Sequence, residues 1–385
     1  MGHGLVHSIE RWNDHEAKRR RFPIKRVNNL YEKLISDDNL KMAIFEVNST
    51  HRWLPHHRPN KTVAWVEEDI SVRINDLKTI IESGFIPASI KKKRIWDKSA
   101  GKWRDISEPQ LWPDQYIHHA LIQVLEPVMM RGMDKFCCGS IRGRGIHYGM
   151  NAIKKWMKNN KKGTKYCLEL DIHHFYDSLE PKIVVNRLLE LVKDRRVIDL
   201  AERIMSNGVL IGVYCSQWFA NITLQPLDHM IREGNFGVSH YLRYMDNFTI
   251  FSSNKRKLRK LMKAISQWLN EHGLMVKDNW QIFCTNDRLP SALGYRYGRG
   301  YTLLRKRNLL RLKRQLKRYY YKKARGQYIS VKMAIGLISR IGQLKHCNST
   351  QIYSKIYKRK TLKELKDIVR KYFRKERNQW NMSLA

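Results

Sequence analysis

Two aspartates of this chain lie where the sequence predicts tightly packed strands. Asp171 closes the apolar run 164–172, and Asp246 lies between the two apolar flanks of the segment 241–252. An Asp beside a buried strand is costly unless a cation meets it. If the two strands are neighbours in one sheet, the carboxylates converge and need a cation between them. Hard oxygen ligands select Mg²⁺ or Mn²⁺, and two such ions ~3.5–4 Å apart serve phosphoryl transfer. Spacing alone also fits two ordinary turn aspartates.

The elements that must position these acids are strands and helices in mixed order. The run 164–172 predicts a buried strand, and 241–252 predicts a β-hairpin with its acidic residue at the tip. Residues 216–231 have apolar side chains at helical spacing, with Pro226 expected to kink or shorten the helix. Residues 185–206 and 256–271 predict amphipathic helices. This order predicts an α+β fold, an antiparallel sheet with helices on one face.

The charge of the chain points to a polyanionic partner. Its 385 residues include 74 Lys and Arg against 35 Asp and Glu, a net charge of +39. Such an excess repels itself in the compact state and is usually kept because a polyanion neutralises it. Residues 301–385 are the most basic, with 25 Lys and Arg against 3 Asp and Glu. A solvated helix face is the ordinary explanation for one basic helix, but several in one stretch favour a nucleic-acid surface.

Within that basic stretch one helix is well marked. Leu309, Leu312, Leu316 and Tyr319 recur at helical spacing, with basic residues on the other faces. The residues that we expect to contact phosphates are Arg311, Arg314, Lys317 and Arg318. Residues 1–50 are also basic and predict helices.

Several classes of protein are excluded or disfavoured. No apolar run approaches the ~18 residues of a transmembrane helix, and the N-terminal segment lacks the apolar stretch of a secretion signal. The six cysteines form no CxxC pair and no zinc spacing, so free thiols in a reducing compartment are expected. We therefore expect a cytoplasmic protein that does not bind membranes.

The segments around the acids resemble the palm motifs of reverse transcriptases. LELDIHHFYDSLEP (168–181), GVLIGVYCSQWFANITLQPLD (208–228) and YLRYMDNFTIF (241–251) occur in the family's order. Segments 101–127 and 137–145 resemble its finger motifs, 269–283 and 293–306 the segments that follow the palm hairpin, and 339–349 a thumb motif of bacterial enzymes.

The resemblance implies a right-hand polymerase with fingers, an antiparallel palm sheet and a helical basic thumb. It implies an N-terminal basic helical extension over 1–90, fingers over 91–160, a palm over 161–300 with part of the fingers near 180–210, and a thumb over 301–385. The implied reaction is RNA-directed DNA synthesis from dNTPs, with two Mg²⁺ or Mn²⁺ ions held by Asp171 and Asp246. Template RNA, cDNA and the RNA–DNA hybrid are the implied partners.

Within that family the chain is most similar to the enzymes of diversity-generating retroelements, which belong to bacteria and their phages. An apolar Ile211 precedes Gly212, and Ser216-Gln217 follows, as in that group. The segment NWQIF (279–283) also resembles that group. This resemblance implies error-prone copying of a template RNA, with a small basic accessory protein that forms a ring, in the cytoplasm of a bacterial host. A defence-associated bacterial reverse transcriptase is a related alternative.

The hairpin departs from the family at one position. The family's Tyr-x-Asp-Asp reads Tyr244-Met245-Asp246-Asn247 here. Asn247 can offer a carbonyl oxygen as an auxiliary metal ligand, but it brings no charge. The lost attraction between unit charges ~4 Å apart is ~4 kcal/mol at an effective dielectric near 20. Three consequences are left open. The protein binds metal more weakly, prefers Mn²⁺, or is a catalytically silent RNA-binding protein.

Further residues are expected around the incoming nucleotide. By resemblance, Tyr176 packs under the sugar and rejects a 2′-hydroxyl, although a core tyrosine is the plain alternative. Arg104 and Arg142 fall in the finger motifs, and a guanidinium suits phosphate oxygens. Lys102 and Lys277 are weaker candidates for the phosphates or, for Lys277, for protonating pyrophosphate.

The loop that contains Gly212 completes the predicted nucleotide site. Gly212 allows backbone to approach the nucleotide or template closely. Ile211 occupies the place of a Gln that relatives hold against the nucleotide, and Gln217 follows in the same motif.

Overall fold

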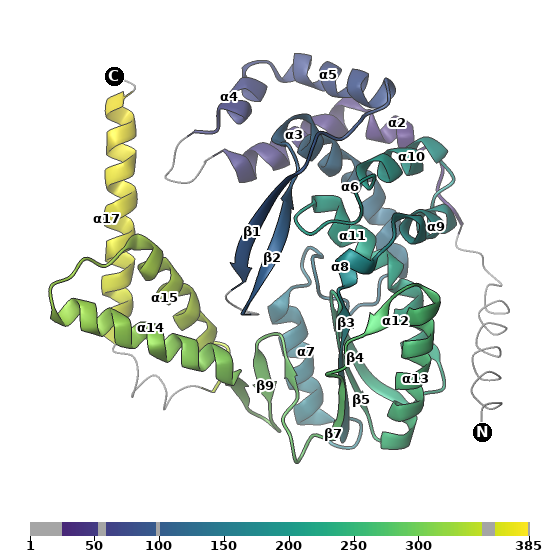
Figure 1. Cartoon of the computed structure of the whole chain (residues 1–385), viewed down its shortest axis with the longest axis vertical. Helices are drawn as coiled ribbons and strands as arrows, with labels where there is room; N and C mark the ends of the chain where they lie inside the picture. The colour runs from purple at the N-terminus through teal and green to yellow at the C-terminus, as the bar shows by residue number, and fades with distance from the viewer. Residues whose placement is uncertain (1–24, 53–58, 98–100, 349–358, 384–385) are drawn as a thin grey trace.

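The computed structural model describes residues 25–52, 59–97, 101–348 and 359–383 of the chain. The described part begins with four helices, continues with runs of strands and helices in mixed order, and ends with three helices (Figure 1). The helices that precede the central sheet are α2 (Leu30–Leu34), α3 (Asp37–His51), α4 (Lys61–Glu68), α5 (Ile70–Glu82), α6 (Tyr116–Met129) and α7 (Ile146–Asn159). Those between its strands are α8 (Phe175–Ser178), α9 (Pro181–Leu191), α10 (Arg195–Ile204), α11 (Tyr214–Thr223), α12 (Gln225–Glu233) and α13 (Lys255–Glu271). The final helices are α14 (Lys306–Ala324), α15 (Val331–Leu344) and α17 (Arg359–Ser383).

The expected antiparallel palm sheet is present. Its strands are β4 (Val238–Tyr244), β5 (Asn247–Ser252), β3 (Tyr166–His173), β6 (Met275–Val276) and β7 (Gln281–Cys284). They lie in the order β4-β5-β3, and β6 and β7 both pair with the far edge of β3. The run predicted as a strand is β3, and the predicted hairpin is β4–β5. The α+β prediction is therefore confirmed.

Helices cover both faces of this sheet, which corrects the expectation of helices on one face. Leu168, Leu170 and Ile250 belong to one core with α11, α12 and α13. Cys167 and Phe251 point the other way, into a second core with α7. Alternate residues of β3 and β5 are thus apolar on both sides, so neither face can be left in water.

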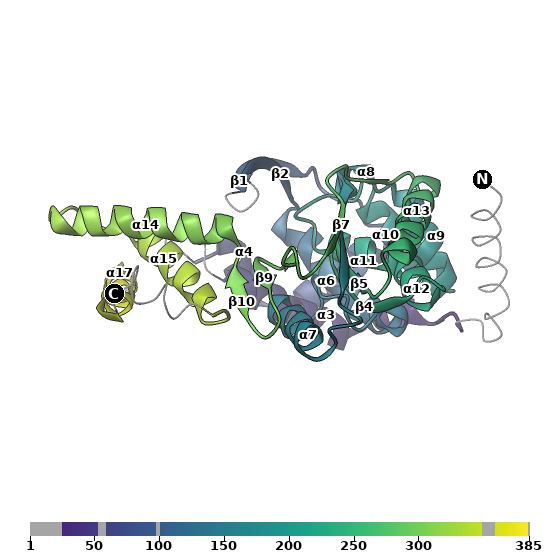
Figure 2. The same cartoon turned by 90° about the horizontal axis from the view of Figure 1, so that it is seen from below.

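The second core continues from the palm into the basic C-terminal helices. A small sheet of β8 (Ser291–Ala292), β9 (Tyr295–Tyr297) and β10 (Thr302–Leu304) lies between α7 and α14. Leu312, Leu316 and Tyr319 of α14 are buried in this core, as their spacing predicts. Figures 1 and 2 both show α14, α15 and α17 standing away from the palm sheet, and these are the helices of the predicted thumb.

Two of the predicted helices are interrupted. The segment 216–231 forms α11 and α12 with a break at Leu224, next to Pro226, as expected. The segment 185–206, predicted as one helix, is α9 and α10. Val192 there adopts an extended conformation and the backbone of the adjoining residue Lys193 donates to Val27. A hydrogen bond to a distant segment thus ends a helix that periodicity alone extends.

The N-terminal helices and a two-stranded ribbon complete the described part. Helices α2, α3 and α5 share one core with α6 and the palm, so the described part of the predicted extension packs into the main body. The N-terminal prediction for residues 1–24 lies outside the described residues. The ribbon of β1 (Lys91–Asp97) and β2 (Lys102–Glu108) projects towards the thumb (Figure 1). Within the described residues, no helix is long and apolar enough to span a bilayer.

Candidate active site

The β4–β5 hairpin brings the two predicted aspartates together. Tyr244 pairs with Asn247, so Met245 and Asp246 alone form the turn, and Met245 has the left-handed φ of 56°. Asp171 on β3 faces Asn247 on β5, and the Ile172 amide donates to the Asp246 carbonyl at 3.2 Å. Antiparallel pairing therefore sets Asp171 and Asp246 side by side at one end of the palm sheet.

Two further side chains complete the immediate surroundings of these acids. The Asn247 Nδ2 atom donates to Asp246 Oδ1 at 2.9 Å. The Lys277 ammonium lies 3.7 Å from Asp171 Oδ2, and its backbone amide donates to the Asp171 carbonyl at 2.9 Å. Lys277, a weak candidate from sequence, thus lies in the site, while Trp280 is exposed. Each carboxylate has a polar or charged neighbour that partly offsets its repulsion of the other.

The donor set fits a divalent cation only in part. Two adjacent carboxylates and the side-chain oxygen of Asn247 are hard ligands of the kind that Mg²⁺ and Mn²⁺ prefer. Among the described residues no group of three or more His, Cys, Asp or Glu side chains could hold a metal ion. Asn247 supplies an amide oxygen where the resemblance implies a further carboxylate, so the sequence departure at this residue is also a departure in the donor set.

Tyr176 lies close to the pair of aspartates. It follows β3 directly, on the short helix α8, and packs half-buried against the main core. Burial is the main cause that raises the pKa of the Tyr176 hydroxyl, and the nearby charge of Asp246 raises it further. The hydroxyl therefore stays protonated beside the turn that carries Asp246, and the packing of the ring under a sugar remains a prediction.

Sequence reasoning missed a buried ion pair beneath the turn. Arg243 on β4 and Asp228 on α12 are both fully buried. Arg243 Nε and Nη2 donate to the two Asp228 oxygens at 2.7 and 2.6 Å. Burial alone would lower the pKa of Arg243, but the charge of Asp228 outweighs it and holds that pKa well above its usual range. Two charged residues in otherwise apolar segments were the sequence signal for this pair.

This ion pair is connected to the backbone of the turn. Arg243 Nη1 donates to the Met245 carbonyl at 3.1 Å and to Asn221 Oδ1 at 2.9 Å. Asn221 Nδ2 in turn donates to the Gly139 carbonyl at 2.9 Å. A Cβ on Gly139 would lie 2.5 Å from Met245 Sδ, so only glycine allows this close approach. The buried Arg243 network therefore holds the backbone of the turn in place from its core-facing side.

The loop that contains Ile211 and Gly212 packs on the ribbon. The Ser107 amide of β2 donates to the Ile211 carbonyl at 2.8 Å. Gly212 has a φ of 106°, and a Cβ there would lie 2.3 Å from the Ser107 carbonyl oxygen. The close approach that Gly212 permits in this structure is thus to β2, and its contact with a nucleotide remains a prediction. Gln217 is exposed on α11, and Ile211 is half-buried.

The two finger arginines lie in different surroundings. Arg104 Nε donates to Asp97 Oδ2 at 2.8 Å across the ribbon. Arg142 is 86% exposed and its Nη2 lies 3.0 Å from Glu46 Oε1 on α3. Neither guanidinium is buried, so both can turn towards an incoming phosphate. Lys102 begins β2, and its side chain lies outside the described part of the structure.

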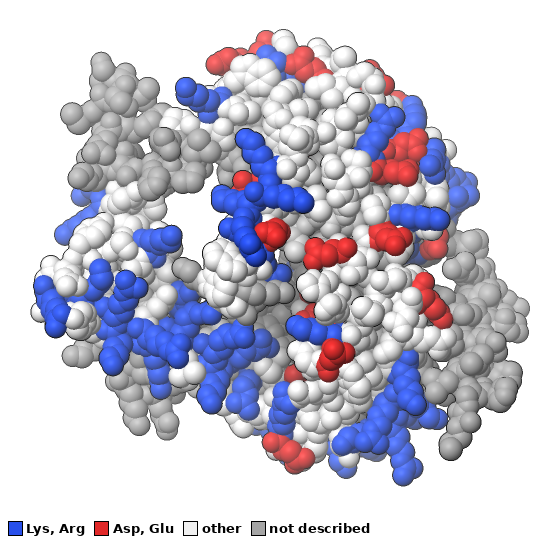
Figure 3. Space-filling view, in the orientation of Figure 1, with Lys and Arg blue, Asp and Glu red and all other residues white. Residues whose placement is uncertain are grey.

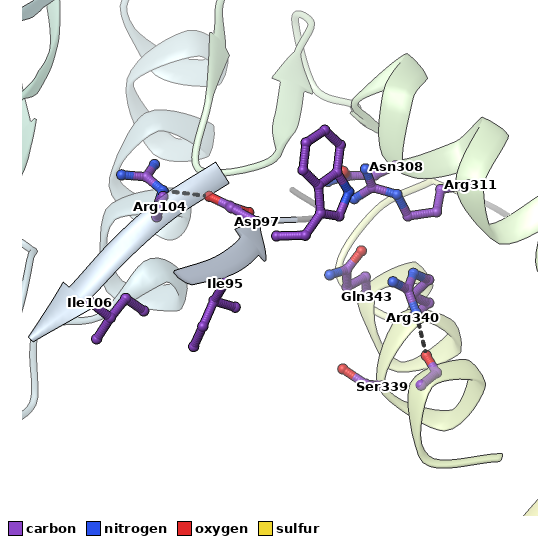
Figure 4. Close-up of a pocket in the computed structure, with 11 residues that line it drawn as sticks. Ile95, Asp97, Arg104, Ile106, Asn308, Arg311, Ser339, Arg340 and Gln343 are labelled. Atoms are coloured by element: carbon purple, nitrogen blue, oxygen red, sulfur yellow. Dashed lines mark hydrogen bonds and ion pairs between the residues drawn. The ribbon is translucent and has the colours of Figure 1, made fainter. Parts of the chain in front are cut away.

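The ribbon and the thumb share one cavity, and it contains two of the predicted arginines. This cavity of about 610 Å³ is lined by Ile95, Asp97 and Arg104 from the ribbon and by Asn308, Arg311 and Arg340 from α14 and α15 (Figure 4). The charge of Arg311 contributes, after burial, to lowering the pKa of Arg340. The structure thus brings Arg104 and Arg311 together, whereas Arg314, Lys317 and Arg318 lie exposed on α14.

All six cysteines are free thiols, as expected, and Cys137, Cys138, Cys167 and Cys215 are buried. Burial raises the pKa of the Cys137 thiol to about 11. The Cys137 thiol donates to Asn221 Oδ1 at 3.5 Å and the Cys138 amide donates to the Arg243 carbonyl at 2.8 Å, so these two cysteines pack against the Arg243 network.

The candidate site lies within a segment of the chain that a protein-family model matches. The family model described as reverse transcriptase (RNA-dependent DNA polymerase) matches residues 90–297, more than half of the chain. Nuclear intron maturase 1, mitochondrial, of Arabidopsis thaliana is 29% identical over 106 residues. That match covers 27% of this chain and only 14% of the maturase.

Two solved structures of apo telomerase from Candida tropicalis are also similar to this chain. The one truncated from its C-terminal domain is 15% identical, with a TM-score of 0.41, and the match covers 56% of this chain and 54% of that one. The other is 11% identical, with a TM-score of 0.44, and the match covers 91% of this chain and 76% of that one.

Proposed function

The chain belongs to the reverse transcriptase (RNA-dependent DNA polymerase) family, and we propose that it is an active nucleotidyltransferase that copies an RNA template into cDNA. The observation that carries the proposal is the pairing of β3 with β5, which sets Asp171 beside Asp246 at an open end of the palm sheet. Both carboxylates are partly exposed, so substrate can reach them.

In the proposed reaction the 3′-hydroxyl of a primer attacks the α-phosphate of a dNTP, and pyrophosphate leaves. Two Mg²⁺ or Mn²⁺ ions, held by Asp171 and Asp246 with help from the Asn247 oxygen, would neutralise the charge that develops on the attacking and leaving oxygens. Asp171 must exchange Lys277 for a metal, which its partial exposure permits.

Other side chains of the chain would position the substrates. Arg104 would leave Asp97 to hold the triphosphate, because a guanidinium binds phosphate oxygens in a bidentate manner. Lys277, already beside Asp171, would donate a proton or a positive charge to the pyrophosphate. Tyr176, bordering the site, would exclude nucleotides with a 2′-hydroxyl. Positioning and charge neutralisation account for most of such a reaction.

Primer extension tests this function directly. The purified chain is given a short RNA template with an annealed DNA primer, dNTPs and either Mg²⁺ or Mn²⁺. We expect extension by the parent and none by Asp246→Asn. Absence of extension by the parent with either metal would favour the second candidate, a silent RNA-binding protein. The observation that supports this second candidate is Asn247, whose amide donates to Asp246 where relatives have an acid.

We propose further that copying is error-prone, as in a diversity-generating retroelement. Ile211 supports this proposal, because an apolar side chain cannot form the hydrogen bonds that a Gln would offer a nucleotide. Loss of one hydrogen bond worth ~1 kcal/mol in differential binding relaxes selectivity by roughly fivefold. Sequencing of cDNA made by the parent and by Ile211→Gln tests this. An accurate parent would favour the defence-associated alternative.

The proposed surroundings of the enzyme depend on the same resemblance. We propose that it acts in the cytoplasm of a bacterial cell, on a dedicated template RNA. A small basic accessory protein that forms a ring is the proposed protein partner. Co-purification from a native host, with the bound RNA sequenced, would test both.

A further inference from the structure

The exposed face of α13 carries a concentration of positive charge that has no acidic partner in the described part of the chain. Six of its first nine residues are Lys or Arg: Lys255, Arg256, Lys257, Arg259, Lys260 and Lys263. Leu258, Leu261 and Met262 of the same turns are buried in the main core, so the cations occupy the whole outer face. We call these six residues the α13 basic face. Figure 3 shows blue side chains without red ones over the lower end of this helix.

Three exposed arginines elsewhere on the body lie beside acids. Arg195 lies 2.7 Å from Asp199, Arg196 lies 2.9 Å from Glu32, and Arg52 lies 2.6 Å from Glu67. Within the described residues, by contrast, the α13 basic face has no ion pair. An ordinary solvated surface mixes both signs of charge, as the upper right of Figure 3 does. The lack of acids at α13 thus distinguishes it from the mixed surface at the upper right of Figure 3 and gives it the one-sign charge that the C-terminal helix α14 also has.

The position of these charges along α13 is also unfavourable for the helix itself. Cations destabilise the first turn of a helix, because the macrodipole is positive there. The last turn of α13, where cations would be favourable, exposes Asn270 and Glu271 instead. The backbone amides of Arg256 and Lys257 are already bonded to the Asn254 side chain, so the side chains are the available donors.

The α13 basic face lies away from the catalytic cleft. Strand β5 runs from Asn247 at the catalytic turn to Ser252, about 17 Å further on, and α13 begins just beyond it. Figures 1 and 2 both show α13 on the side of the palm sheet opposite the thumb helices. Lys165 adds to the positive charge at this end, since its neighbour Tyr166 pairs with Ser252. A hybrid held between palm and thumb does not reach this face.

We propose that the α13 basic face binds the phosphate backbone of a folded segment of the template RNA, outside the cleft. This inference rests on the proposed function, which supplies an RNA long enough to contact two sides of the enzyme. Lys and Arg side chains spread over about 13 Å of helix match a row of phosphates and recognise no base sequence. Binding there would hold a long template on the enzyme while its other end passes through the cleft.

A set of matched variants tests the proposal. The α13 variant carries R256Q, R259Q, K260Q and K263Q. The control carries K33Q, K41Q, K61Q and K182Q, which remove the same charge from exposed lysines scattered over α2, α3, α4 and α9. Gln keeps a good helix propensity, and removal of cations from the first half of α13 leaves the helix as stable or more stable. Thermal unfolding verifies that both variants fold.

The readout is the binding of a double-stranded RNA hairpin to enzyme that already holds a short primer–template. We expect the α13 variant to bind the hairpin at least ~10-fold more weakly near 0.1 M salt. Its log–log salt dependence should flatten by about one unit for each phosphate that the variant no longer neutralises. Extension of the short primer–template should be unchanged, and the control should bind the hairpin like the parent.

Three results would overturn the proposal. If the parent and the α13 variant bind the hairpin with equal affinity and salt dependence, the face is only solvated. If the α13 variant and the control lose hairpin affinity equally, the effect comes from net charge and not from this face. Binding of the parent, but not of the α13 variant, to phosphatidylserine vesicles, with RNA binding unaffected, would assign the face to a membrane. A parent that extends no primer would refute the proposed function alone, since hairpin binding is measured independently.

Discussion

Two ion pairs flank the turn that carries Asp246, and they differ in their access to water. Arg243 and Asp228, below the turn, are both 0% exposed and form a bidentate pair. Lys277 and Asp171, beside it, are 43% and 28% exposed, with 3.7 Å between the charged atoms. Loss of one partner from a buried pair costs about 3–5 kcal/mol, whereas an exposed pair contributes about 0–1 kcal/mol. The buried pair therefore maintains the shape of the turn, and the exposed pair can be exchanged for substrate or metal.

The largest expected effect concerns the partly exposed acids Asp171 and Asp246, and it is an effect on DNA synthesis and not on stability. Asp171→Asn or Asp246→Asn should reduce DNA synthesis by on the order of 1,000-fold or more, because a metal ligand worth several kcal/mol of transition-state stabilisation is lost. RNA affinity and the unfolding temperature should change little. Primer extension and thermal unfolding of the same preparations measure both. Near-parental synthesis by either variant would refute the assignment of these acids.

The next largest effect is on the buried side and concerns stability. Arg243→Met leaves Asp228 buried without its partner and should lower the free energy of unfolding by about 3–5 kcal/mol. Arg243→Met combined with Asp228→Leu should recover part of that stability, because no buried charge is left alone, while the buried Tyr241 hydroxyl loses Asp228 as its acceptor. Urea unfolding measures both.

The rate of DNA synthesis by the same two variants distinguishes an effect on activity from the effect on stability. The double variant should remain poorly active, because the Met245 carbonyl lacks its Arg243 donor. A cost below ~1 kcal/mol for Arg243→Met alone would remove the contrast between the two ion pairs.

A smaller effect is expected at Asn247, which is hydrogen-bonded to Asp246 in the turn between the two ion pairs. Asn247→Asp replaces the amide that donates to Asp246 with a second carboxylate. Without metal, the variant should be less stable by about 1 kcal/mol, because that hydrogen bond is missing. With metal, it should reach half-maximal synthesis at several-fold lower Mg²⁺, because a further charged ligand is present. Titration of Mg²⁺ in primer extension measures this. Synthesis at background would show instead that the site requires Asn.

The smallest effect on stability is expected from Lys277→Gln. The exposed pair with Asp171 should contribute no more than about 1 kcal/mol to the free energy of unfolding. Direct binding of Mn²⁺, followed by its electron paramagnetic resonance signal, should strengthen because a competing cation is removed. The maximal rate of synthesis should fall if Lys277 assists the leaving pyrophosphate. Destabilisation as large as that of Arg243→Met would contradict the comparison.

The elements around the site could be predicted from the sequence because their signals are local. The short apolar run 164–172 predicts β3, and the apolar flanks of Met245-Asp246 predict the β4–β5 hairpin. The break between α11 and α12 follows from Pro226, whose ring cannot continue a helix. The boundary between α9 and α10 could not be predicted, because a hydrogen bond to the distant Val27 decides it.

The sequence by itself determined which residues could do the chemistry and in what order they occur. It determined a basic chain with aspartates at the end of one apolar strand and in the turn of a hairpin, because side-chain periodicity and turn composition are properties of neighbouring residues. Tertiary structure alone decided which residues meet. The contacts of Arg243 with Asp228, of Lys277 with Asp171, and of Gly212 with Ser107 each join separate segments. Such contacts depend on how elements pack against one another, and burial then determines whether a charge is fixed in place or remains exchangeable.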